Sequence, residues 1–306
     1  MITASLLLAA AWTLVPGSFA PAKGPDGNSV LIDAPAGLVL VDTGRHPAHQ
    51  DKLIAAARAR GKPVAAIVNT HWHLDHTGGN AEMRAAFPSI PIIGSDAVDG
   101  ALKGFFPRSR AAAEAHIASG KAPPEQVAEI RRDMAAMDDL ANLRPSQVVR
   151  RTGAMTIAGR RFEVHLERHA ATAGDVWLYD PNERLAVVGD LVVAITPFMD
   201  TACPEGWRAA LANIEKAPFR TLVPGHGAAM DRAAFRRWRL AFNNLLDCAK
   251  GTATKEACID GWLRDAAEFT PATEQTRVRG MIGYYVDSRL RAAPQEKARY
   301  CPDGAG

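Results

Sequence analysis

The sequence has little that would tie it to a polymeric partner or to a specialised class of protein. No block of lysine or arginine is dense enough to indicate nucleic acid or an anionic membrane as a partner, and 36 basic residues are balanced by 33 acidic ones. Its 25 glycines and 20 prolines are too few for a low-complexity chain, and it has no CxxC pair of the kind found in structural zinc ribbons. What is present, 47% apolar and 23% charged residues over 306 positions, is typical of a globular protein with a sizeable core. A small molecule is therefore the expected partner, and the oligomeric state stays open.

The N-terminal segment is apolar from Ala4 to Val15 apart from two hydroxyl residues. It is too short to span a bilayer but has the length of the apolar region of a signal peptide, although no lysine or arginine precedes it. We expect a shortened or atypical export signal that ends near Ala11. The alternative is that Trp12 to Phe19 forms the first strand, after a trimmed leader or a frayed end.

The chain has four cysteines, Cys203, Cys248, Cys258 and Cys301. Cys248 and Cys258 flank a short segment with Gly and Thr between two helical patterns, a separation at which a disulfide could join a helical hairpin. An even count fits an oxidising compartment, so a periplasmic or secreted location is expected. Four buried free thiols in a cytoplasmic enzyme are the alternative.

Apolar runs alternate with helical patterns along the first third of the chain. Strands are predicted at residues 29–34, 37–41, 64–69 and 90–94, and helices at residues 49–60 and 81–87. Asn80 can cap the second of these helices. The strand at 64–69 is short and apolar, as in a sheet buried on both faces.

From residue 96 to about 145 the composition changes to Ala, Arg, Glu and Asp with helical spacing, which indicates a helical insertion. Strand patterns return at residues 148–151, 155–158, 161–167, 176–179, 185–188 and 221–223, with a helix at 206–216. A helical tail follows from Met230 onward. We therefore expect one α/β domain at 12–229 that contains the insertion, with residues 230–306 as its helical extension.

Residues of metal-binding type are concentrated between Asn69 and Asn80, directly after the buried strand at 64–69. Side chains there project from the carboxyl end of a strand, where α/β folds place their sites. Three imidazoles and a carboxylate within six residues match the ligands that Zn²⁺ prefers. Because side chains alternate in an extended loop, His71 and His73 point the same way, and Asp75 and His76 follow one turn later. The spacing predicts two adjacent metal sites.

These residues resemble the metallo-β-lactamase superfamily, whose HxHxDH motif is complete here as His71, His73, Asp75 and His76. Three further landmarks follow the family's order, at residues 41–44 (Val-Asp-Thr-Gly), 188–190 (Val-Gly-Asp) and 223–227 (Val-Pro-Gly-His-Gly). The resemblance implies a four-layer αβ/βα sandwich with metals at one edge of two sheets. Residues 12–19, 25–28 and 200–207 are also similar to a periplasmic branch associated with quinoprotein and sulfur-oxidation systems.

The resemblance also implies a role for each ligand. His71 and His73 would bind the first metal, and Asp75, His76 and His226 would bind the second. Asp190 would bridge the two metals. One departure concerns the first metal, because the histidine that the family usually has before a T-x-G-D segment is Ala171 here. The nearest candidates are His169, expected as a ligand on a reshaped loop, and His165 further back on the strand.

The function implied is hydrolysis by a hydroxide bound to two Zn²⁺ ions, with an ester, thioester, lactone or amide of a small organic molecule as substrate. Asp75 could also orient the hydroxide, and Arg45 could hold an anionic substrate group or be solvated. A β-lactamase and a non-enzymatic metal-binding accessory protein of a periplasmic redox system are the alternatives. Five residues could wall an apolar pocket or belong to the core: Trp72, Phe105, Phe106, Phe198 and Met199.

Other polar residues near these motifs have structural interpretations. Asp42 is expected to brace a loop as a hydrogen-bond acceptor, and Asp175 to fix the turn at 172–174. Cys203 is expected in a disulfide or as a structural thiol rather than as a metal ligand.

Overall fold

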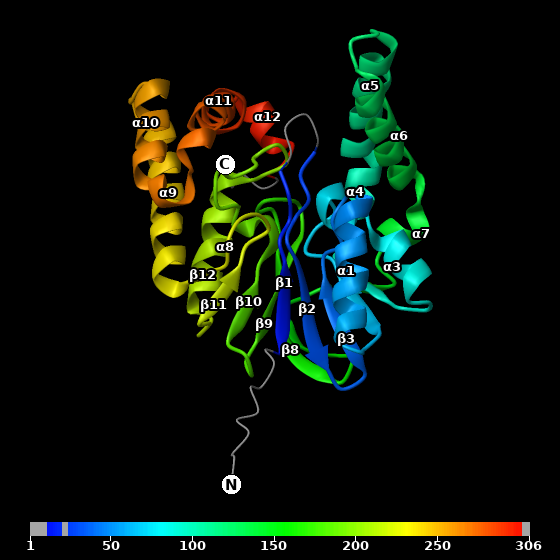
Figure 1. Ribbon diagram of the computed structural model, residues 1–306. Helices are drawn as coiled ribbons and strands as arrows, with labels where there is room; N and C mark the ends of the chain where they lie inside the picture. The colour runs from blue at the N-terminus through cyan, green and yellow to red at the C-terminus, as the bar shows by residue number, and fades with distance from the viewer. Residues whose placement is uncertain (1–10, 20–23, 302–306) are drawn as a thin grey trace.

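The computed structural model describes residues 11–19 and 24–301 and has two facing β-sheets with helices on their outer sides (Figure 1). Within the described residues, the first sheet has the strand order β1 (Trp12–Val15), β2 (Ser29–Ala34), β3 (Gly37–Val41), β4 (Val64–Val68), β5 (Ile92–Gly94) and β6 (Gln147–Val148). The second has the order β12 (Met230–Asp231), β11 (Thr221–Val223), β10 (Leu185–Val187), β9 (Asp175–Asp180), β8 (Arg160–Glu167) and β7 (Gly153–Ile157). The expected four-layer αβ/βα sandwich is confirmed.

Side chains alternate between the two faces of each strand, so each sheet contributes to a core between the sheets and to a core under its own helices. On β2, Val30 and Ile32 belong to the core between the sheets, whereas Leu31 belongs to the core under the first sheet's helices. On β9, Leu178 faces the other sheet and Trp177 faces the helices of its own side. Successive strand residues point to opposite faces, so strands apolar at every position are buried on both.

Two pairs of helices form the outer layers. Helices α1 (Pro47–Ala59) and α3 (Asn80–Ala86) pack on the first sheet, and α8 (Pro204–Lys216) and α9 (Arg232–Lys250) pack on the second. Helix α9 buries Phe235, Trp238 and Phe242 at spacings of three and four, which places all three on one face.

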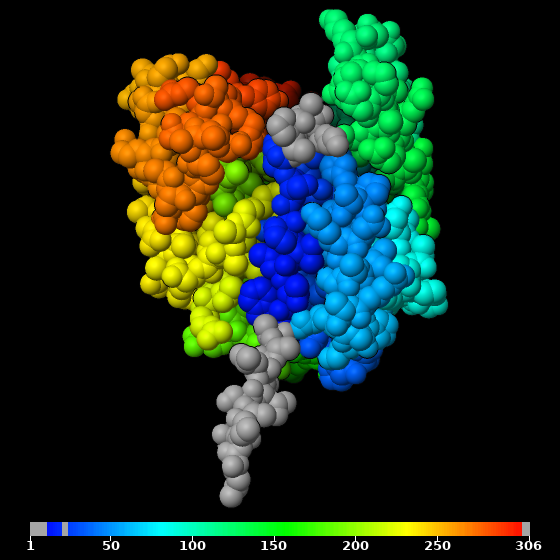
Figure 2. All heavy atoms as spheres, in the orientation of Figure 1, coloured from blue at the N-terminus to red at the C-terminus, as the bar shows by residue number. Residues whose placement is uncertain are grey.

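The insertion and the tail are helical, and both project from the same end of the sandwich (Figures 1 and 2). The insertion consists of α4 (Val98–Lys103), α5 (Phe105–Ala118), α6 (Pro124–Asp138) and α7 (Leu140–Leu143). The tail after α9 consists of α10 (Lys255–Asp265), the 3₁₀ turns η2 (Ala267–Phe269) and η3 (Ala272–Glu274), α11 (Gln275–Tyr285), the π-helical η4 (Val286–Leu290) and α12 (Pro294–Ala298). Buried tail residues join one hydrophobic cluster with α8 and α9.

Both disulfides involve the tail. Cys248–Cys258 joins α9 to α10, a pairing that the separation in the sequence allowed. Cys203–Cys301 joins the residue before α8 to the residue that ends the described chain. The four cysteines are therefore paired, and of the two roles expected for Cys203, a disulfide or a structural thiol, the structure has the disulfide.

Two details differ from the sequence predictions, and one prediction lies outside the described residues. Asn80 does not cap α3 but is its first residue, because its side chain bonds across the fold to Asn69 and to the backbone carbonyl of Asn142. Met230 begins the short strand β12 rather than a helix, since it pairs with Leu222. The expected export signal falls on residues 1–10, outside the described residues, and β1 begins at Trp12. Within the described ranges, no helix is both long and apolar enough to cross a bilayer.

Candidate metal centre

The loops that follow β4, β10 and β11 bring the predicted ligands together where the two sheets meet. The loop after β4 carries His71 and His73, and the short helix α2 (Leu74–Thr77) carries Asp75 and His76. Asp190 lies in the 3₁₀ turn η1 (Gly189–Leu191) after β10, and His226 follows β11. The edge that the resemblance implied is therefore where six of the seven proposed ligands lie.

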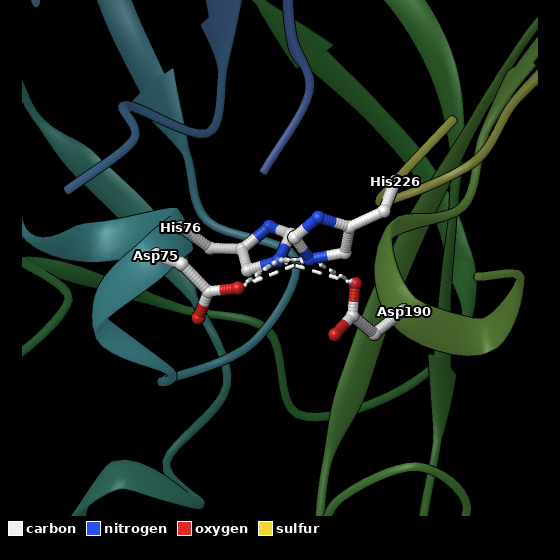
Figure 3. A group of neighbouring side chains, drawn as sticks. All are labelled: Asp75, His76, Asp190 and His226. Atoms are coloured by element: carbon white, nitrogen blue, oxygen red, sulfur yellow. Dashed lines mark hydrogen bonds and ion pairs between the residues drawn. The ribbon is translucent and has the colours of Figure 1, made fainter. Parts of the chain in front are cut away.

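The ligand atoms form two groups that share Asp190. In the larger group, Nε2 of His76 lies 3.1 Å from Oδ1 of Asp190 and 3.3 Å from Nε2 of His226. Oδ2 of Asp75 completes that group at 3.0 Å from Nε2 of His226 (Figure 3).

In the smaller group, Nε2 of His71 lies 3.0 Å from Nδ1 of His73 and 3.7 Å from the other oxygen, Oδ2, of Asp190. One carboxylate therefore faces both groups.

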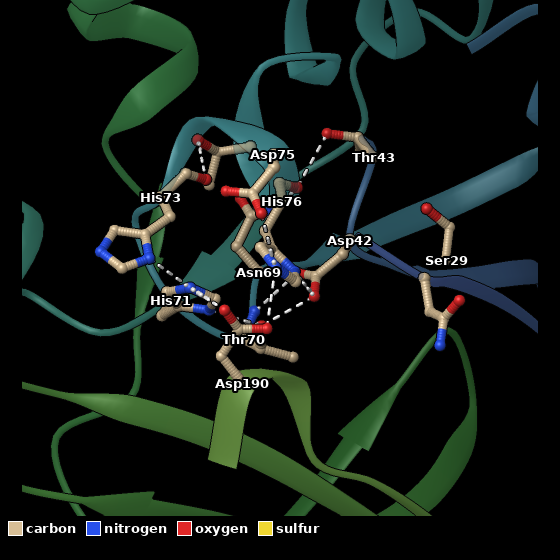
Figure 4. Close-up of polar contacts among 12 residues, drawn as sticks. Ser29, Asp42, Thr43, Asn69, Thr70, His71, His73, Asp75, His76 and Asp190 are labelled. Atoms are coloured by element: carbon tan, nitrogen blue, oxygen red, sulfur yellow. Dashed lines mark hydrogen bonds and ion pairs between the residues drawn. The ribbon is translucent and has the colours of Figure 1, made fainter. Parts of the chain in front are cut away.

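Hydrogen bonds on the side of three imidazoles that faces away from the shared space fix which nitrogen carries the proton, and Figure 4 shows the surroundings of two of them, His71 and His76. Asp42 accepts from Nδ1 of His76 at 2.8 Å and from the hydroxyl of Thr70 at 2.7 Å. Because that hydroxyl's proton goes to Asp42, its oxygen accepts from Nδ1 of His71 at 3.0 Å. The Nε2 atoms of His71 and His76 are thereby left as lone pairs that point into the shared space.

The third imidazole is oriented from the other side of the site. The Thr201 hydroxyl donates to the carbonyl of Ala171 at 3.1 Å, so its oxygen accepts from Nε2 of His73 at 3.2 Å. Nδ1 of His73 is then the free lone pair, opposite that of His71.

This donor set fits a metal. Asp190 is buried, and neither carboxylate oxygen accepts a hydrogen bond within the described structure. Lone pairs and carboxylate oxygens that converge in a buried space repel one another unless a cation lies between them. Imidazole nitrogen and carboxylate oxygen are ligands for divalent ions of the zinc type.

Charge and burial set the protonation of the same cluster. Burial lowers the pKa of His71 well below its usual value, which keeps this imidazole neutral as a ligand must be. Burial would also lower the pKa of His76, but the carboxylates of Asp190, Asp75 and Asp42 outweigh it and raise that pKa well above its usual value. Burial opposes ionisation of Asp190, yet the neighbouring His76 and His226 hold its pKa low. The carboxylates thus favour a positive charge at this place, which a proton on Nε2 of His76 supplies without a metal and which a metal ion would supply in its stead.

Two glycines allow the loops to come this close. A Cβ on Gly225 would lie 2.0 Å from Oδ1 of Asp190, and a Cβ on Gly27 would lie 2.4 Å from the His76 ring. Any other residue at these positions would displace the side chains of the centre.

The structure does not bring His169 into either group. Its Nδ1 is buried without a hydrogen-bond partner, and its backbone has φ of 54°, with its carbonyl oxygen only 1.9 Å from where a Cβ on Gly206 would lie. His165, the other candidate, stacks on Trp177 with ring centroids 3.7 Å apart. As placed, the smaller group holds two imidazoles and the shared carboxylate, and the role of His169 stays a prediction.

A cavity of about 700 Å³ opens beside His73 and Asp75. Of the aromatic residues expected to wall a pocket, four line it: Trp72, Phe105, Phe106 and Phe198. Met199 does not line it but is fully buried in the core of the second sheet. Helices α5 and α6 and the tail supply most of the remaining wall.

Arg45 also borders the cavity but is held by the insertion. Its Nε donates to Asp133 of α6 at 2.8 Å, and Nη2 contacts the same carboxylate. Next to it, His46 contacts Asp26 and Glu129, so α6 is fastened to the loop that leads into α1. These contacts were not foreseen from the sequence.

The family model for the metallo-beta-lactamase superfamily matches residues 22–226. The chain belongs to this superfamily. Its candidate metal site consists of the side chains described above.

The curated relatives of this superfamily member carry the names of different enzymes. A linear primary-alkylsulfatase from a Pseudomonas species is 26% identical over 64% of this chain and 40% of its own length. An atrochrysone carboxyl ACP thioesterase from Aspergillus fumigatus is 34% identical over 21% of this chain and 20% of its own. A hydroxyacylglutathione hydrolase from Thermosynechococcus vestitus is 38% identical over 18% of this chain and 22% of its own. The matched regions thus span well under half of these relatives.

Solved structures share the fold at low identity. A metallo-beta-lactamase family protein from Thermus thermophilus aligns over 91% of this chain and 94% of its own, with a TM-score of 0.59 and 17% identity. A metallo-beta-lactamase from Pontibacter korlensis aligns over 78% and 97%, with a TM-score of 0.56 and 17% identity.

Proposed function

We propose that the protein holds two zinc ions and hydrolyses an ester, thioester, lactone or amide of a small organic substrate. The observation that carries this proposal is Asp190, whose two oxygens face two different groups of ligand atoms. A shared carboxylate between imidazoles is suited to a pair of ions rather than to one. Zinc bound there would polarise the substrate carbonyl and lower the pKa of a bound water toward neutrality.

The chain's own residues then perform three tasks. Asp42, Thr70 and Thr201 fix the proton on the far nitrogen of an imidazole and so aim the near nitrogen. Asp75 is a ligand whose carboxylate lines the cavity and can orient the attacking water. Trp72 and Phe105, with ring centroids 5.0 Å apart, give the organic part of the substrate an apolar surface.

The relatives support a bond of the ester class. Two of those named above, the thioesterase and the hydroxyacylglutathione hydrolase, carry names for thioester or acyl hydrolysis. The lactamases resemble the chain in fold at under 25% identity, which does not favour a β-lactam over an ester as substrate. Nitrocefin therefore serves below as a comparison substrate.

Export is part of the proposal. Two disulfides that together use all four cysteines support an oxidising compartment, hence a periplasmic or secreted location. Four titratable free thiols in protein isolated from its native cell would contradict it.

Metal content per chain, measured by elemental analysis of freshly purified protein, tests the centre. We expect about two zinc ions, with loss of both in Asp190→Ala and in Asp190→Asn. The control is Asp180→Asn, another buried carboxylate, which pairs with Arg160 at 2.5 Å and lies outside the groups, so it should keep both. In His169→Ala, a drop from two ions to one would make His169 a ligand, and an unchanged count would show that it is not one.

Activity is tested on the same preparations with a chromogenic ester, a thioester, a lactone and nitrocefin. Hydrolysis of at least one of the first three, lost on chelation and restored by zinc, is expected. Turnover of nitrocefin alone would indicate a β-lactamase. A protein with no metal and no turnover would be an accessory protein instead.

A further inference from the structure

The cavity beside the metal centre is lined at its outer part by arginines from two distant segments. Arg108 comes from α5 in the insertion, and Arg289 comes from η4 in the tail. Both meet Tyr300, whose hydroxyl lies 3.5 Å from Nη2 of Arg108 and whose ring lies 5.0 Å from the Arg289 guanidinium carbon. The three side chains bridge the insertion and the tail across the cavity.

These two guanidinium groups lack the acidic partners that the other cationic side chains of the cavity have. Arg45 is paired with Asp133, and Arg299 lies 3.5 Å from Glu296. Among the described residues no carboxylate lies within ion-pair distance of Arg108 or Arg289. The Nε of Arg289 is moreover buried with no hydrogen-bond partner. A guanidinium donor that is buried without a hydrogen-bond partner is energetically unfavourable. The guanidinium group of arginine can bind a carboxylate in bidentate fashion, through two parallel hydrogen bonds.

Among the described residues that line the cavity, the carboxylates besides Asp133 are Asp75, a proposed metal ligand, and Asp200, and Asp200 does not neutralise the two arginines. Asp200 accepts a hydrogen bond of 2.8 Å from the hydroxyl of Tyr285 and lies near His73, on the metal side. The cavity is therefore apolar and aromatic next to the metal ligands and cationic where α5 meets the tail.

The position of Arg108 on α5 indicates how long a ligand must be to reach from the metal ligands to this arginine. Phe105 stacks near Trp72 and lies 6.1 Å from the His73 ring, centroid to centroid. Arg108 follows three residues later, about 4.5 Å further along the helix axis. A ligand with its scissile bond at the metal ligands and an apolar body along Phe105 would place a terminal group near Arg108.

We propose that the substrate is an anionic amphiphile, with a carboxylate at the end of an apolar chain remote from the scissile bond, and that Arg108 and Arg289 bind this carboxylate. The proposal rests on the hydrolytic function proposed above and names its substrate class. The carboxylate sets specificity and takes no part in the bond cleavage.

Two chromogenic esters that differ in one group form the test. Mono(4-nitrophenyl) adipate and 4-nitrophenyl hexanoate have the same leaving group and a six-carbon acyl chain, and only the first has the terminal carboxylate. For the zinc-loaded protein we expect kcat/KM to be at least about tenfold higher for the adipate ester, as for a charge-assisted hydrogen-bonded pair. Arg108→Gln and Arg289→Gln should each remove most of that preference through KM, with the hexanoate ester unaffected.

Arg279→Gln is the matched control, since this arginine is also in the tail but is paired with Asp260 on the surface at 2.6 Å. It should keep the full preference. Equal kcat/KM values for the two esters in the wild type, or a preference that both cavity variants retain, would overturn the proposal and leave the hydrolytic function standing.

A second measurement does not depend on turnover. Calorimetric titration of the zinc-loaded proteins compares adipate with hexanoate, which differ by the same carboxylate. Wild type should bind adipate at least about tenfold more tightly, and the two arginine variants should bind both acids alike. A protein that binds adipate preferentially yet hydrolyses no ester would contradict the proposed function while supporting the anion site; equal binding of the two acids by wild type would overturn the site.

Discussion

Replacement of Asp42 by Asn should weaken metal binding without any change at a ligand. Asp42 accepts hydrogen bonds from the backbone amide of Thr70 at 2.8 Å, from its hydroxyl at 2.7 Å and from Nδ1 of His76 at 2.8 Å. All three donors lie in the buried interior. An asparagine has one acceptor atom and one amide group, so at least one donor would face an N–H instead of an oxygen.

The consequence for His76 can be worked out from the tautomer. With an N–H opposite it, Nδ1 would shed its proton to become an acceptor, and the proton would move to Nε2, the atom that points at Asp190 and His226. A protonated Nε2 cannot bind a metal. Loss of a partner that orients a ligand typically lowers metal affinity 10- to 100-fold, or about 1.4–2.7 kcal/mol. We expect that loss in the larger group, with the smaller group less affected.

Competition with a chromogenic chelator measures both dissociation constants, and Asp180→Asn again serves as the control for a lost buried carboxylate. Unfolding of the metal-free proteins separates loss of stability from loss of binding. An Asp42→Asn protein with two unchanged dissociation constants would refute the idea that Asp42 sets the tautomer of His76.

Three further expectations concern the surroundings of the centre. Asp26 accepts from two backbone amides and the ring of His46; burial raises its pKa, but these donors lower it to about 2, below the unfolded value of 3.8. It should therefore stabilise the fold by about 2 kcal/mol above pH 4 and lose this as pH falls toward 2, so that urea unfolding of wild type and Asp26→Asn converges in acid. His46 has a raised pKa, chiefly through its hydrogen bond to Asp26, so its contribution is present below pH 6.5 and lost as pH rises through the raised value, which denaturation of His46→Gln should reveal. The Cys203–Cys301 disulfide closes a loop with a sequence separation of 98, so Cys301→Ser should lower the unfolding free energy by up to about 4.7 kcal/mol, and unchanged thermal unfolding would contradict this. The same substitution should reduce the preference for adipate, because Tyr300, next to Cys301, is then no longer held against the two arginines of the cavity.

The sequence is informative where local pattern and chain order suffice. Strands β2, β3 and β11 have the predicted bounds because they are apolar at nearly every position and end at turn residues. The segment from His71 to His76 could be interpreted because four ligand-type residues within one loop and helix turn leave few alternative roles. The brace at Thr172 was also foreseeable, since Asp175 accepts from its amide at 2.8 Å only three residues away.

The contacts that could not be foreseen join segments far apart in the chain. Asp42 accepts hydrogen bonds and braces a loop as expected, but the identity of its partners, on the loop after β4 and on α2, could not be predicted. Arg45 forms an ion pair with Asp133, 88 positions away, and Cys203 forms a disulfide with Cys301, 98 positions away. Such pairings depend on how the insertion and tail fold back, which periodicity does not encode. Asn80 was misassigned for the same reason: a residue type that often caps helices instead bonds to other parts of the fold.

The metal ligands and part of the cavity wall lie in different parts of the chain, which explains why the relatives do not by themselves identify the substrate. All six clustered ligands lie within residues 22–226, the part that the superfamily model matches. Arg289 and Tyr300, which border the cavity, lie beyond it, and the curated relatives match this chain over 64% or less. Metal ligands shared with the superfamily support a shared type of chemistry. The cavity wall that selects a substrate comes partly from the tail, which lies outside the residues that the superfamily model matches. Exchange of cavity residues in the tail should therefore change which ester is preferred and leave the metal content as it is.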